Sequence, residues 1–203
     1  MTTESAHQSI DTHVPTADNI TTNDDQLAEH QYSDTGLAVL RNALHQPIDE
    51  LLDLAPLITA DMFPNAHDGK IWRAIIDVAT ETHNTGDTTA FVQEVLVNGH
   101  LVGKGEFAND SFRHRWNDVA FPGNRFKPAV WEQFEQMVVI LAESRYRGLF
   151  RATFGDSCDF DGYTIADIDL AIKHRVDRLR RARVQLSALQ NRNLQAVSAP
   201  EVA

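Results

Sequence analysis

Histidine has the widest chemical capacity of any side chain in this sequence, because imidazole can bind a metal ion or transfer a proton near neutral pH. The chain has nine histidines in 203 residues. They are scattered, and none stands in the H-E-x-x-H pattern or at another close ligand spacing. We therefore expect no metal site. His67, just before a predicted helix, is interpreted as ordering the turn at that helix's start through side-chain hydrogen bonds.

The single cysteine, Cys158, could act as a nucleophile only in its thiolate form. It lies among Asp156, Asp159 and Asp161, and neighbouring carboxylates disfavour a further negative charge. An unreactive loop cysteine is therefore the simpler interpretation. One cysteine also excludes an intramolecular disulfide and a multi-cysteine zinc site, which is compatible with a reducing cytoplasm.

A glycine-containing segment from Gly99 to Gly105, GHLVGKG, is the nearest approach to a phosphate-binding loop. Such a loop, G-x-x-x-x-G-K-[ST], brings backbone N–H groups, a lysine and a Mg²⁺-binding hydroxyl together on the phosphates. The segment is one residue short, lacks the final Ser or Thr, and follows a predicted helix rather than a strand. We interpret it as a helix that Gly99 closes in the left-handed conformation, followed by a loop. We expect no cofactor and no ATP hydrolysis.

One basic cluster stands out in a chain whose net charge is −11. Its members are Lys173, Arg175, Arg178, Arg180, Arg181 and Arg183, with Asp177 as the only acid among them. These side chains could flank an apolar seam and cover it with their methylene stems. They could instead contact an acidic partner surface, or DNA phosphates. The aromatic residues that single-strand binding favours are absent from residues 173–190.

The elements that would position these residues are helical, because the apolar residues recur at helical spacing and no alternating pattern stands out. We predict an all-α fold made of a compact helical bundle, residues 34–121, and a long antiparallel helical hairpin, residues 122–186. Residues 1–33 carry six acids and no Lys or Arg, and are predicted to be a disordered acidic tail. Residues 187–203 are predicted to be a flexible C-terminal tail.

The predicted hairpin has an apolar seam along each of its two helices. The second helix is expected to begin at Thr164, with Asp167 completing a near capping box. A two-helix hairpin cannot cover both flanks of such seams, so we expect at least a dimer. The predicted oligomer or partner interface consists of Phe134, Val138, Leu141, Ile172, Val176 and Leu179.

A local pattern precedes the central helix of the predicted bundle. Asp61-Met62-Phe63 is followed by a proline and His67, and then by an amphipathic helix with Ile71 and Trp72, which we expect in the core. This order, with a bundle first and a hairpin after it, resembles the N-terminal domain of the DnaB-family replicative DNA helicases. The resemblance covers roughly residues 36–186 and departs from the family at residues 33–36 and 103–119.

The resemblance implies a role at replication without catalysis. Family members continue into an ATPase domain with a phosphate-binding loop, and this sequence has no such loop. We therefore expect a non-enzymatic module that pairs with itself, a replicative helicase, a primase or a loader, and so modulates helicase assembly, loading or activity. One rival is a DNA-contacting regulator that uses residues 173–183. Another is a catalytic protein with an enclosed polar pocket.

The cellular location expected from the sequence is the cytoplasm. The first residues, MTTESAHQSIDTH, have no basic end and no apolar run, so they do not resemble a signal peptide. No window approaches the roughly 18 apolar residues of a membrane span. We therefore expect no membrane partner.

Overall fold

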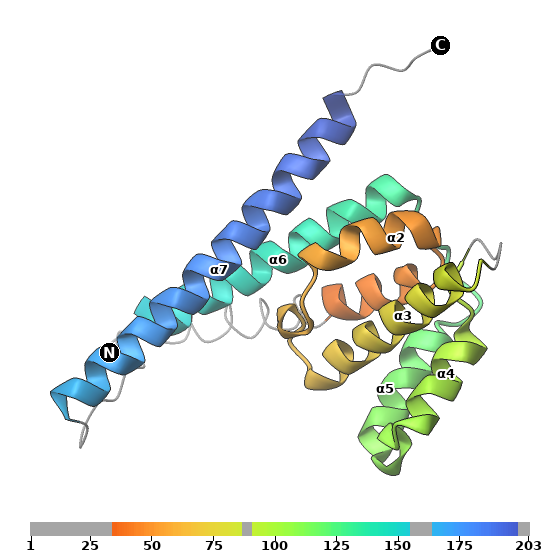
Figure 1. Ribbon diagram of the computed structural model, residues 1–203, viewed down its shortest axis with the longest axis horizontal. Helices are drawn as coiled ribbons and strands as arrows, with labels where there is room; N and C mark the ends of the chain where they lie inside the picture. The colour runs from red at the N-terminus through yellow and green to blue at the C-terminus, as the bar shows by residue number, and fades with distance from the viewer. Residues whose placement is uncertain (1–33, 87–90, 155–163, 199–203) are drawn as a thin grey trace, which may run out of the picture.

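The computed structural model describes residues 34–86, 91–154 and 164–198 (Figure 1). Within these ranges the secondary structure is helical and contains no strand, apart from one isolated bridge between Pro47 and Phe91. The all-α prediction is confirmed. The predicted acidic tail of residues 1–33 and the loop with Cys158 lie outside the described residues.

The described helices form a bundle followed by two long helices. A first helix covers residues 34–43. The bundle continues with α2 (Ile48–Leu54), η1 (Ala55–Leu57), η2 (Ala60–Met62), α3 (Ala66–Asn84), α4 (Glu94–Gly103), η3 (Glu106–Ala108) and α5 (Asp110–Ala120). The two long helices are α6 (Trp131–Phe154) and α7 (Ile165–Ser198). None of the helices described combines the length and apolar character needed to cross a membrane.

Asparagine side chains begin two of the bundle helices. Asn65 accepts a hydrogen bond from the backbone N–H of His67 at 2.9 Å, which satisfies one free donor at the start of α3. Asn109 caps α5 in the same way, through Ser111 and Phe112. At the start of α7, the Thr164 hydroxyl lies 2.6 Å from the Asp167 carboxylate and accepts from the Asp167 backbone N–H. The predicted capping arrangement at Thr164 is confirmed.

The core of the bundle surrounds α3. Ile71, Trp72 and Ile75 are buried on it, as the position of Trp72 beside apolar residues on one amphipathic helix predicted. The Trp72 indole N–H donates to the carbonyl of Ile58 at 3.1 Å, so its one polar group is satisfied. Gly69 brings α3 close to η2, because a Cβ there would lie only 2.5 Å from the carbonyl oxygen of Ala60.

The two long helices pack side by side, and α7 projects beyond the bundle in both directions (Figure 1). The helix α7 continues to Ser198, so the predicted boundary of a flexible tail at residue 187 is wrong. Leu189 is buried, and Arg192 donates to Glu135 of α6 at 3.0 Å. These contacts give the continued helix a packed face.

Candidate interaction surfaces

The α6 part of the predicted interface is buried inside the chain. Phe134, Val138 and Leu141 are fully inaccessible to solvent, because this half of α6 lies against both the bundle and α7. Arg145 marks the same junction, since it pairs with Asp61 of η2 and donates to Gln185 of α7. The three apolar side chains therefore stabilise the monomer, and their assignment to an oligomer interface is wrong.

The α7 part of the predicted interface lies nearer the surface. Ile172 is 46% exposed, and Val176 and Leu179 are half-buried. At this level α7 has passed the bundle, and among the described residues α6 is the element that packs against it (Figure 1). Ile172 thus remains available to a partner, and Val176 and Leu179 remain so in part.

A patch on the outer half of the hairpin joins side chains from both helices. The Arg183 guanidinium lies 5.9 Å from the centre of the Tyr146 ring. This contact shows which side of α7 lies next to which side of α6. Ile172 and Val176 share a helix face with Arg183, eleven and seven residues before it, and Phe150 lies one turn after Tyr146. We call Phe150, Phe154, Ile172 and Val176 the distal patch.

The two phenylalanines of the distal patch form its most prominent feature. Their ring centroids are 4.9 Å apart, and Phe154 is 60% exposed. Sequence reasoning missed both because it searched for aromatic residues only within α7. The sequence does contain an indication of this surface. Arg147 and Arg151 alternate with the two phenylalanines, so basic and aromatic side chains share one stretch of α6.

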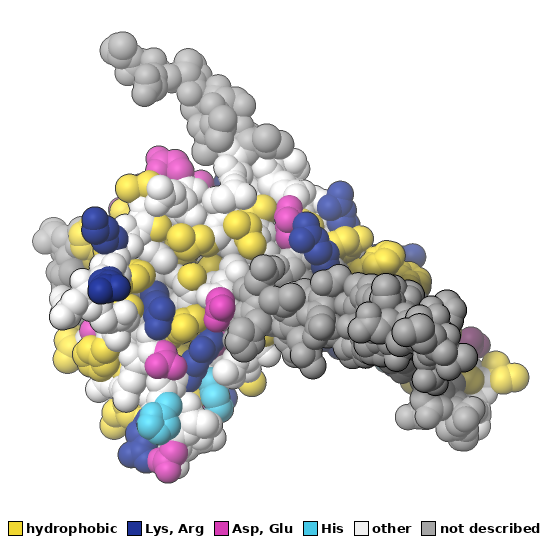
Figure 2. Space-filling model, turned by 180° about the vertical axis from the view of Figure 1, so that it is seen from behind, with side chains coloured by type: hydrophobic (Ala, Val, Ile, Leu, Met, Phe, Trp, Pro, Cys, Tyr) yellow, Lys and Arg dark blue, Asp and Glu magenta, His cyan; other side chains and the backbone are white. Residues whose placement is uncertain are grey.

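The predicted basic cluster surrounds this part of α7. The side chains of Lys173, Arg178, Arg180, Arg181 and Arg183 are exposed, and Arg175 is half-buried. Arg180 lies 3.8 Å from Asp177, a long and solvated ion pair that contributes little stability. Figure 2 shows basic side chains beside hydrophobic ones along the hairpin. The cluster therefore rims apolar surface that no described part of the chain covers.

Charge is unequally divided between the two ends of the molecule. Residues 144–154 and 164–183 carry nine Lys and Arg against three Asp, a net charge of +6. Residues 34–86 and 91–143 carry fifteen acids against eight bases, a net charge of −7. The outer hairpin is therefore strongly basic, and the bundle with the inner part of α6 is acidic.

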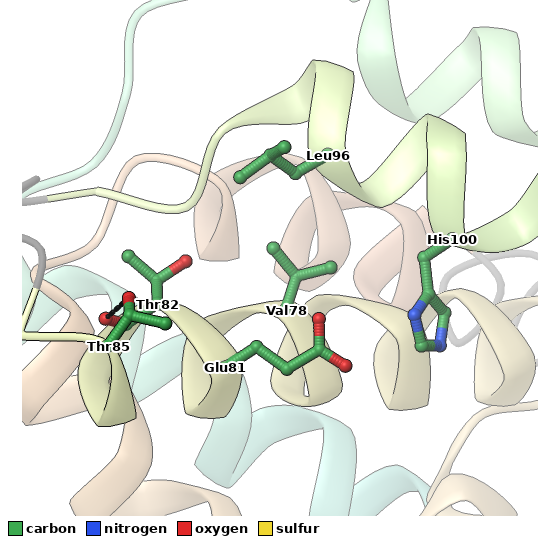
Figure 3. A pocket seen from close by; sticks show the side chains of 6 residues that line it. All are labelled: Val78, Glu81, Thr82, Thr85, Leu96 and His100. Atoms are coloured by element: carbon green, nitrogen blue, oxygen red, sulfur yellow. Dashed lines mark hydrogen bonds between the residues drawn. The ribbon is translucent and has the colours of Figure 1, made fainter.

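A shallow pocket of about 290 Å³ lies between the second half of α3 and α4 (Figure 3). Leu96 and His100 from α4 face Val78, Glu81 and Thr82 from α3, and Thr85, which directly follows α3. His100 Nε2 lies 3.1 Å from Asp77, and the Lys104 amine lies 2.9 Å from the same carboxylate. Lys104 thus forms an ion pair across two helices.

The glycine-containing segment ends a helix, although not at the predicted residue. The helix α4 runs through Gly99 to Gly103, and Gly105 takes the left-handed conformation, with φ of 71°. The prediction that Gly99 closes the helix is wrong, because α4 continues for a full turn past Gly99, to Gly103.

His67 connects two helices. Its Nε2 lies 3.0 Å from the Ser111 hydroxyl, and its ring meets Phe112 edge-on at 5.4 Å between centroids. Asn65 caps the turn, so the His67 ring links α3 to α5 rather than ordering the turn itself. Among the residues described, no three His, Cys, Asp or Glu side chains are placed to hold a metal ion.

A buried ion pair sits beside this junction. Arg115 of α5 reaches the fully buried Asp68 carboxylate through Nε and Nη2, each 2.6 Å from one oxygen. The hydrogen bond to Asp68 is the main cause that raises the pKa of Arg115 above its usual range. The pair is bidentate and fixes α5 on α3, which gives it a structural role.

Comparison with protein-family models, curated proteins and solved structures finds no match for this chain. The geometry itself defines an all-α bundle with a projecting hairpin, whose basic outer half carries the exposed distal patch.

Proposed function

We propose that this chain is a non-enzymatic interaction module of DNA replication, related to the N-terminal domain of the DnaB-family helicases. The order of bundle and hairpin supports the proposal, as does the Phe63 and His67 pattern before a buried central helix. In this role the chain contacts a replicative helicase, a primase or loader, or a second copy of itself. The contact modulates helicase assembly, loading or activity.

The distal patch is the observation that carries this proposal. It places two adjoining, mutually tilted aromatic rings and two branched apolar side chains on rigid helices, beyond the part of the hairpin that the bundle covers. Contiguous exposed apolar surface with a polar rim is typical of protein contact sites. Aromatic anchors with arginine beside them are also the residue types that carry most binding energy at such contacts.

The charge around the patch favours an acidic partner surface. Bases rim the patch on both helices, through Arg147 on α6 and Arg180 and Arg183 on α7. Complementary charge of this kind speeds association and rejects partners with a basic surface. Lys104 is the one lysine in the segment of residues 99–105, whose sequence comes nearest to the phosphate-binding pattern. Its amine forms an ion pair with Asp77. This supports a role without ATP hydrolysis.

Binding to the helicase and primase of the encoding organism tests the proposal. Replacing Phe154 and Ile172 by Ser should weaken capture of the helicase or primase, because the change removes apolar contact and leaves the buried core unchanged. Phe121→Ser is the matched control, since Phe121 is 67% exposed on the bundle. If the wild-type chain captures neither protein and leaves unwinding unchanged, the proposed function is wrong.

DNA contact is a second candidate, favoured by the position of the α6 aromatic residues. Tyr146, Phe150 and Phe154 lie next to the basic face of α7, as single-strand binding favours. Changing Arg178, Arg180, Arg181 and Arg183 to Glu should then abolish DNA retention at low salt. Retention by the wild type at physiological salt, together with no binding to helicase or primase, would favour this candidate over the first.

A further inference from the structure

A second apolar surface lies on α4, at the other end of the molecule from the distal patch (Figure 1). Val97 and Leu101 face the core, but the opposite side of α4 is apolar too, and Val95 is 69% exposed. We call the exposed residues Phe91, Val95, Leu96 and Val102 the head patch. A short surface helix that is apolar on both sides is expected to have its outer side covered.

The surroundings of the head patch are acidic. The pocket between α3 and α4 borders it at Leu96 and carries the Glu81 carboxylate at its rim (Figure 3). Glu81 forms no ion pair with any residue that the structure describes, whereas Asp77, one turn earlier, is paired with Lys104. Asp49 and Glu50 of α2 add two exposed carboxylates beside the end of α3, where His83 meets Asp49 at 3.1 Å.

We propose that the distal patch of one copy docks on the head patch of a second copy. The inference rests on the proposed function, since it names the partner of the same hairpin surface. Each patch is apolar, and their rims have opposite charge, so each supplies what the other lacks. Phe150 and Phe154 are the anchors, and the pocket that Val78 and Leu96 line together with polar side chains offers a recess beside Glu81, whose carboxylate complements the arginine rim.

The geometry requires two molecules. The two patches lie at opposite ends of the long axis and belong to rigid helices, so one chain cannot bring them together (Figure 1). Docking unlike surfaces of identical copies gives a head-to-tail contact, which leaves one patch free at each end of a dimer. Association should therefore extend beyond two copies as concentration rises, unless the assembly closes on itself.

A charge-exchange experiment on the full chain tests the contact. The hairpin variant carries Arg180→Glu and Arg183→Glu, and the head variant carries Glu50→Lys and Glu81→Lys. All four side chains are exposed, so circular dichroism and the melting temperature should match those of the wild type. Sedimentation velocity at tens of micromolar protein and low salt measures association, and Arg125→Glu is the control charge reversal at an exposed residue of the connection between α5 and α6.

Each charge variant alone should associate at least about tenfold more weakly than the wild type, because like charges then meet at the contact. An equimolar mixture of the two should regain association, since every hairpin then finds a head of opposite charge. Added salt should weaken the wild-type assembly, and Arg125→Glu should leave it unchanged. If the two variants associate when mixed but not separately, the two surfaces are identified as partners.

Three results would overturn the proposal. They are a monomeric wild type at tens of micromolar, folded variants that associate as the wild type does, and a mixture that stays as weak as its components. A monomer that binds the host helicase would keep the proposed function and reject this contact. Charge-exchange behaviour without binding to helicase or primase would keep this contact and reject the replication role.

Discussion

Trp72 offers a direct test of the bundle core. Its side chain is only 3% exposed, packs 6.0 Å from the Phe63 ring, and donates its indole N–H to the Ile58 carbonyl at 3.1 Å. Removing a large buried aromatic costs about 3–5 kcal/mol. Trp72→Ala also leaves the Ile58 carbonyl without its donor, so we expect the upper part of that range, about 4–5 kcal/mol.

Chemical and thermal unfolding followed by circular dichroism would measure this loss. For a chain of this size, 1 kcal/mol corresponds to roughly 2–4 °C, so the melting temperature should fall by roughly 10–15 °C. Trp72→Phe keeps most apolar contact and loses only the hydrogen bond, so its cost should be about 1–2 kcal/mol. Phe121→Ala, on the surface, should change stability by no more than about 0.5 kcal/mol. An unchanged midpoint for Trp72→Ala would show that the core is packed differently.

Three further changes probe the contacts between helices. Arg115→Met should destabilise the fold by about 3–5 kcal/mol in urea unfolding, because it leaves the Asp68 charge buried and unpaired; a neutral effect would mean that water reaches Asp68. Gly69→Ala should cost at least about 1–3 kcal/mol, because its Cβ would meet the Ala60 carbonyl, and an unchanged melting temperature would contradict that close approach. Deleting residues from 187 onward should lower the melting temperature by removing the buried Leu189 and the hydrogen bond from Arg192 to Glu135 of α6, whereas a freely frayed tail would leave it unchanged.

The sequence was sufficient for the features that depend on local periodicity. Helical spacing predicted an all-α chain, and the apolar neighbours of Trp72 on one amphipathic helix predicted its burial. Thr164 and Asp167 predicted the start of α7, since a capping arrangement needs only three residues of chain. These features are decided within one helix, where spacing and burial are directly related.

Features that depend on the position of the hairpin against the bundle were not predictable in the same way. An apolar stripe shows that a face is covered but does not show what covers it, so Phe134 and Leu141 resembled a dimer seam. The polar composition after residue 187 concealed a helix that Leu189 anchors on α6. The distal patch combines two helices that are separated along the chain, and only their packing places Phe154 and Ile172 on the same outer half of the hairpin.

The measurement closest to the central claim is site-specific photocrosslinking from the distal patch. A photoreactive residue at position 172, in the full chain mixed with the host helicase, primase and single-stranded DNA, would report what contacts this surface. We predict crosslinks to the helicase, to the primase or to a second copy, well above those from the same group placed at position 121. Crosslinks to DNA alone, or none above the position 121 control, would contradict the account of the hairpin as a protein-binding element.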